Sequence, residues 1–109
     1  MKNQILEITD DNFETEVSKS KEPVMIDFYA EWCKPCIIMA STIEELKEEF
    51  DGKVKITKLN IEENSEIAKK FNISNIPAIL LFKNGKVVDR HIGLRSKKDI
   101  KKDLEGVVA

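Results

Sequence analysis

The chain has few of the residues that specify an unusual architecture. Its 109 residues include two cysteines, one histidine, one tryptophan, four glycines and three prolines. A disulfide framework needs more cysteines than this, and a flexible linker needs proline, glycine or serine gathered in one place. We see no internal repeat or boundary either. We therefore expect a single domain over residues 1–109.

The chain also lacks a large excess of charge of either sign, and it has no long apolar run. Lysine and arginine number 18 against 20 acidic residues, a net charge of -2 that predicts neither nucleic-acid nor membrane binding. No apolar run approaches the roughly 20 residues that cross a bilayer. The first residues, MKNQILEITDD, hold no apolar stretch of signal-peptide length. Unless a signal has been removed, we expect a cytosolic location, where a permanent structural disulfide is disfavoured.

The apolar pattern that is present predicts strands alternating with helices. The run PVMIDFYA (23–30) is typical of a central strand covered on both faces. Asn84-Gly85, between two apolar runs, indicates a hairpin with a type I′ turn. Other strands are expected at residues 4–8 and 53–60, and helices near residues 13–17, 36–50, 65–71 and 97–108.

Side chains that can cap helices precede each of three predicted helices. Thr9, Asp10 and Asp11 stand before the first, Asn64 or Ser65 before the third, and Ser96 with Asp99 resembles a capping box before the last. The order is βαβαβα followed by ββα, which predicts an α/β fold with a mixed sheet and helices on both faces. Strands separated by helices are expected to be parallel, and the hairpin is expected to add an antiparallel edge.

Both cysteines lie in EWCKPC (31–36), directly after the predicted central strand. Ligand chemistry in such sheets gathers beyond the carboxyl ends of the strands. A zinc site within one chain fails because Cys33, Cys36 and His91 are too few ligands, which leaves a metal shared between chains as a minor alternative. His91 is more simply explained as a strand-edge or surface residue. A structural bridge is weak because it would close a very short loop.

Two inert buried thiols remain possible, but the local chemistry favours a reactive pair. Cys33 opens a helix, where free backbone N–H groups stabilise a thiolate, and Lys34 adds a cation. Pro35 suits a first helical turn. Cys36, on the apolar stripe, should be the more shielded sulfur. We therefore expect Cys33 to attack a partner disulfide and Cys36 to resolve the mixed disulfide.

An acid interrupts the apolar strand six residues before Cys33. Asp27 is either a strand-edge acid that reaches water or a desolvated carboxyl that exchanges a proton with Cys36. Lys58, on the next predicted strand, is either its neighbour or an ordinary solvated lysine. The residues leave both pairs of alternatives open.

Together these residues resemble the thioredoxin family over essentially the whole chain. The matching segments are DFYAEWCKPC (27–36), KLNIEEN (58–64), NIPAILLFKNGK (75–86) and Ile92-Gly93. The resemblance implies a central mixed five-stranded sheet flanked by four helices. It implies that Cys33 is the nucleophile, Cys36 the resolving thiol, Asp27 the buried acid and Lys58 its neighbour.

The resemblance also implies an apolar surface that docks partner proteins around a cis proline, with Lys34 and Pro35 beside the sulfurs. Its expected members are Trp32, Ile61, Ile76, Pro77, Ile92 and Gly93. The chain departs from the usual pattern at several positions. These are Tyr29 for tryptophan, Lys34 for glycine, Ser41 for proline, Asn75 for glycine and Ala78 for threonine. Lys34 puts the reduction potential and partner choice in question, and Asn75 and Ala78 put the detail of the docking groove in question.

By this resemblance the chain is expected to be a monomeric protein disulfide reductase with no bound cofactor. A separate thioredoxin reductase would recharge it with electrons from NADPH or another donor, and disulfide-containing proteins would be its substrates. One alternative is a more oxidising disulfide oxidase or isomerase, although these commonly have histidine between the cysteines. The other is a non-catalytic binding module or subunit with the same fold.

Overall fold

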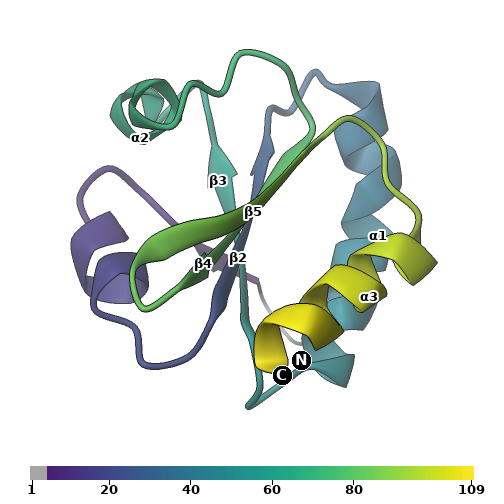
Figure 1. Cartoon of the computed structure of the whole chain (residues 1–109). Coiled ribbons are helices and arrows are strands. Elements are labelled where there is room, and N and C mark those ends of the chain that lie inside the picture. The colour runs from purple at the N-terminus through teal and green to yellow at the C-terminus, as the bar shows by residue number, and fades with distance from the viewer. Residues whose placement is uncertain (1–4) are drawn as a thin grey trace.

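The computed structural model describes residues 5–109, in which a five-stranded sheet separates two layers of helix (Figure 1). The strands are β1 (Leu6–Glu7), β2 (Val24–Tyr29), β3 (Lys55–Asn60), β4 (Ala78–Lys83) and β5 (Lys86–Ile92). The helices are α1 (Lys34–Glu49), α2 (Ser65–Lys70), α3 (Lys97–Val108) and a short π-helical turn, η1 (Glu14–Ser18). The predicted mixed five-stranded α/β sheet is confirmed; residue 4, expected to begin β1, lies outside the described residues.

The strand order is β1-β3-β2-β4-β5, so the apolar strand β2 lies at the centre. β3 is parallel to β1 and to β2, as expected for strands joined through helices. The same expectation is wrong for β4, which follows α2 but runs antiparallel to β2. The chain between α2 and β4 therefore returns to the sheet without making a parallel crossover.

The two faces of the sheet carry two separate apolar cores. Alternate residues of β2 divide between them: Val24, Ile26 and Phe28 face η1 and α2, whereas Met25 faces α1 and α3. Figure 1 shows α1 and α3 together on one side of the sheet and α2 on the other. Because side chains alternate along a strand, Asp27 points to the same side as Met25, toward α1.

The hairpin between β4 and β5 has the predicted turn. Asn84 and Gly85 both have positive φ angles, 55° and 79°, as a type I′ turn requires. Gly85 also lies against the chain that leaves η1, because a Cβ there would stand 2.7 Å from the Ser18 carbonyl oxygen. Any side chain at Gly85 would therefore be both strained and in collision with backbone.

The first predicted helix is only a five-residue π-helical turn, η1. Thr9 and Asn12 stabilise the chain before it, since the Thr9 hydroxyl accepts from the Asn12 N–H at 3.0 Å and the Asn12 side chain accepts from the Thr9 N–H at 2.7 Å. Val17 and Phe13 bury the expected apolar face. The local cap is therefore present, but the helix beyond it is short.

Asp10, expected at the start of that first helix, instead caps α2. Its carboxylate accepts hydrogen bonds from the backbone N–H groups of Ile67 at 3.0 Å and Glu66 at 3.4 Å. The predicted cap residue Asn64 makes no side-chain cap there and accepts from the Asp10 N–H at 3.1 Å. Asn64 is the N-cap residue of α2, as predicted, but Asp10, more than 50 residues earlier in the chain, supplies the capping carboxylate in place of the Asn64 side chain.

We expect Asp10→Ala to lower the free energy of unfolding by about 1 kcal/mol, the usual effect of removing a capping side chain. Chemical denaturation gives the value. Asp11→Ala is the matched control, because Asp11 is an exposed neighbour of the same charge. Equal losses in both variants would show that general charge, not the cap on α2, accounts for the effect.

Candidate active site

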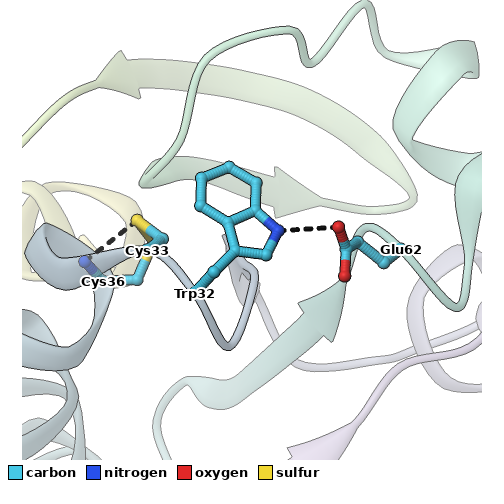
Figure 2. Close-up of a disulfide and its surroundings, with 4 residues drawn as sticks. All are labelled: Trp32, Cys33, Cys36 and Glu62. Atoms are coloured by element: carbon cyan, nitrogen blue, oxygen red, sulfur yellow. Dashed lines mark hydrogen bonds between the residues drawn. A yellow bond between two sulfur atoms is a disulfide. The ribbon is translucent and has the colours of Figure 1, made fainter.

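The two cysteines lie where the central strand passes into α1. Cys33 is the residue that caps α1, and its sulfur accepts a hydrogen bond from the Cys36 backbone N–H at 3.2 Å (Figure 2). The two residues form a disulfide, with their Cα atoms 5.3 Å apart. Pro35 lies in the first turn of α1, as predicted. The Cys36 N–H in the first turn of α1 therefore points at the Cys33 sulfur, where it stabilises negative charge.

The expected difference in exposure between the sulfurs is absent in this disulfide state. Cys33 and Cys36 are each 4% exposed, because both pack with Ala30 and against Ile61 and Ile76. Their surroundings differ instead. Cys33 lies at the helix N-terminus, whereas Cys36 lines a cavity of about 230 Å³ that also holds Asp27.

Asp27 is a buried carboxyl rather than a strand-edge acid. It is 4% exposed, and its Oδ1 has no hydrogen-bond partner. Burial raises the pKa of Asp27 from 3.8 to about 7, and the nearby charge of Lys58 opposes part of that rise. A carboxyl with this pKa can accept or release a proton near neutral pH. It lines the same cavity as Cys36.

Lys58 is the register partner of Asp27 on β3 and lines the same cavity. Its side chain is 37% exposed, and its ammonium lies 3.5 Å from a carboxylate oxygen of Glu7 and 5.4 Å from the centre of the Tyr29 ring. Lys58 is thus neither a freely solvated lysine nor a direct ion-pair partner of Asp27. Glu7 was missed by sequence reasoning, because the register that places it beside Lys58 is not visible in the sequence.

Several of the residues expected to dock partners lie close to the disulfide. Ile61 and Ile76 pack against the cysteines, and the Ile76–Pro77 peptide bond is cis. The Gly93 N–H donates to the Pro77 carbonyl at 2.7 Å, which places the end of β5 beside this bond. The exposed members of the set are Trp32, Lys34, Pro35 and Ile92.

Trp32 has a partner that the sequence did not reveal. Its indole N–H donates to a Glu62 carboxylate oxygen at 2.6 Å, so the ring turns toward the loop after β3 (Figure 2). The indole is 64% exposed in spite of this bond. A large apolar ring fixed beside the disulfide and open to solvent is suited to contact with another protein.

His91 has more contacts than a plain surface residue. Its Nε2 lies 3.0 Å from Asp89 and 3.2 Å from Asp103, close enough together for the three side chains to be considered as metal ligands. Arg95, however, already forms a two-point ion pair with Asp103, at 2.7 and 3.0 Å. A cation beside the same carboxylate opposes metal binding, so we interpret the group as a polar cluster between β5 and α3 in which the Arg95–Asp103 pair is the ion pair.

The fold and the site together define a class of protein. It has an α/β architecture and two paired cysteines at the start of the helix that follows the central strand, and these cysteines undergo thiol–disulfide exchange. The family model for thioredoxin matches residues 4–106. Thioredoxin from Rickettsia bellii is 47% identical over 93 residues, which cover 85% of this chain and 89% of that protein. Thioredoxin from Buchnera aphidicola subsp. Acyrthosiphon pisum is 45% identical over 103 residues, 94% of this chain and 95% of that one. Thioredoxin from Chlorobaculum thiosulfatiphilum is 43% identical over 99 residues, 91% and 92% respectively.

The chain therefore belongs to the thioredoxin family, and its fold is the thioredoxin fold. Its function is thiol–disulfide exchange, with the Cys33–Cys36 pair as the redox-active group. Family membership implies substrate proteins and a reductase as its general kinds of partner. Within residues 5–109, no helix has the length and apolar character to span a membrane.

Proposed function

We propose that the protein is a general protein disulfide reductase in which Cys33 attacks and Cys36 resolves. The observation that carries this assignment is the placement of the two sulfurs. Cys33 accepts a backbone N–H at the start of α1, which favours its thiolate, while Cys36 lines the cavity that holds Asp27. The attacking sulfur is thereby stabilised as an anion, and the resolving thiol has a proton acceptor nearby.

The exchange transfers two electrons to the substrate. The Cys33 thiolate forms a bond with one sulfur of the substrate disulfide, and the other substrate sulfur leaves as a thiolate that takes up a proton. Cys36 then loses its proton and attacks Cys33. The intramolecular disulfide forms, and the substrate sulfur that was bonded to Cys33 leaves as a thiolate that takes up a proton. The substrate is then reduced and the protein is oxidised.

Asp27 is proposed to accept the proton of Cys36 in the second step and to return it when the disulfide is reduced again. Its raised pKa and its place in the shared cavity support this role. Lys58 is proposed to assist by favouring the ionised form of Asp27. Cys33, Cys36, Asp27 and Lys58 are thus the proposed catalytic and assisting groups.

Substrate proteins are proposed to dock on the surface around the disulfide. An extended substrate segment would pair with the backbone beside the cis proline while apolar side chains contact the surrounding ring of residues. The proposed surface consists of Trp32, Lys34, Pro35, Ile61, Ile76, Pro77, Ile92 and Gly93.

The proposed electron source is a thioredoxin reductase that draws on NADPH or another donor, with no cofactor bound to the chain itself. We also propose that residues 1–109 form a single domain and that the protein works as a monomer in the cytosol. The family match over residues 4–106 supports one domain. The sequence-based expectations of a cytosolic monomer that binds neither nucleic acid nor membrane stay predictions.

Reduction of insulin disulfides tests the proposal directly. With NADPH and a thioredoxin reductase, the protein should catalyse insulin precipitation, and dithiothreitol should replace the reductase as donor. Equilibration with defined glutathione buffers then gives the reduction potential. A strongly oxidising potential would favour the oxidase or isomerase alternative, and no turnover with either donor would favour a non-catalytic binding module.

A further inference from the structure

One lysine lies between two carboxylates on three neighbouring strands. Lys58 on β3 is the register partner of Glu7 on β1 and of Asp27 on β2. The ammonium pairs with Glu7 at 3.5 Å, and among the ion pairs of residues 5–109 none joins it to Asp27. Of its two acidic neighbours, Lys58 therefore pairs with the one at the surface.

Tyr29 explains why Glu7 holds this position. The Tyr29 hydroxyl hydrogen-bonds to both carboxylate oxygens of Glu7, at 2.9 and 3.2 Å. The Lys58 ammonium lies over the same ring, 5.4 Å from its centre, a favourable cation–π distance. Burial, together with the bond to Glu7, raises the pKa of Tyr29, so its hydroxyl remains protonated and can donate throughout the working range.

We propose that Glu7 and Tyr29 are positioning residues that hold the Lys58 ammonium at the outer rim of the cavity, away from Asp27, and so limit how strongly Lys58 assists the resolving step. This inference rests on the proposed role of Asp27 as proton acceptor.

The charges around Asp27 come from several elements. Lys58 and Tyr29 line the cavity from the sheet, Glu31 from the loop before α1, and Cys36 and Glu44 from α1 itself. Among the ion pairs of residues 5–109, the Lys58 ammonium is paired with Glu7, and the Tyr29 ring lies under the same ammonium. Loss of Glu7 releases the ammonium and removes a nearby negative charge, and both changes favour ionised Asp27.

The test follows the rate at which a preformed Cys33 mixed disulfide is resolved, from pH 5 to pH 9. Glu7→Gln should speed resolution about two-fold at pH 6, where little wild-type Asp27 is ionised, and leave pH 9 unchanged. Tyr29→Phe should act in the same direction more weakly. Glu14→Gln, an exposed acid on η1, is the charge-matched control and should match the wild type.

A double-mutant cycle with Lys58→Gln separates positioning from charge alone. If Glu7 acts through Lys58, most of the Glu7→Gln effect should disappear when Lys58 is already Gln. Equal effects in both backgrounds would mean that Glu7 acts by its own charge, and would overturn the inference. No effect of Glu7→Gln at pH 6 would overturn it as well.

Asp27→Asn distinguishes this inference from the proposal beneath it. If Asp27→Asn leaves the pH profile of resolution unchanged, the proposed role of Asp27 fails. If Asp27→Asn alters the profile but Glu7→Gln and Tyr29→Phe do not, only the positioning role fails. The chemical shift of the Asp27 carboxyl carbon, followed by NMR as pH is varied, gives a second readout. Glu7→Gln should lower the pH at the midpoint of this titration.

Discussion

Asp27→Asn should make the oxidised protein markedly more stable at pH 8 and change its stability little at pH 4. The carboxyl is buried with a pKa of about 7, against 3.8 in the unfolded chain. Between these values the folded state binds a proton that the unfolded state has released, so stability falls as pH rises. The loss is about 1.4 kcal/mol per pH unit, on the order of 4 kcal/mol by pH 8.

Asparagine carries no charge at any pH, so it removes this loss while it keeps the shape of the side chain. Denaturant unfolding at pH 4, 6 and 8 measures the effect as a widening gap between the variant and the wild type. Asp11→Asn, at an exposed position, is the control and should give no such gap. A constant difference at all three pH values would show that Asp27 does not titrate in the folded protein as its burial implies.

Cys36→Ser should trap substrates as stable mixed disulfides, whereas Cys33→Ser should form none. In the first variant the attacking thiolate remains at the start of α1, but the group that releases the product is gone. Multiple turnover should therefore be lost, while one equivalent of a disulfide peptide stays attached. Non-reducing electrophoresis and intact mass measure the covalent complex.

The double variant Cys33→Ser/Cys36→Ser is the control for other attachment, because the chain has no further cysteine. Covalent capture by Cys33→Ser, without capture by Cys36→Ser, would reverse the assigned roles of the two sulfurs. Capture by both variants would mean that the N-terminus of α1 does not select the attacking thiol.

Features set by neighbouring residues could be predicted from the sequence. The apolar run 23–30 became the central strand β2, and α1 begins at Lys34, directly after the cysteine that caps it. Asn84-Gly85 forms the predicted turn, and the Ser96 hydroxyl accepts from the Asp99 N–H at 3.1 Å at the start of α3. Each depends on hydrogen bonds, backbone angles or burial within a few residues.

The family and the reacting pair were also accessible, because EWCKPC sits in one short segment beside a buried strand. The sequence could place Asp27 in an apolar strand but could not say whether the carboxyl reached water. Only the packed layer of α1 over β2 decides that, since it encloses Asp27 and raises its pKa.

Contacts between side chains that lie far apart in the sequence depend on strand register or on the packing of distant loops, and only the tertiary structure shows them. The Asp10 carboxylate caps α2, and the indole N–H of Trp32 donates a hydrogen bond to Glu62 in a different loop. Lys58 pairs with Glu7 because β1 and β3 align at that residue. A shift of one residue in that register would turn the Glu7 side chain to the other face. The sequence by itself therefore determined the fold class and the exchange chemistry. The charge environment that tunes this chemistry arises only when the strands are in register.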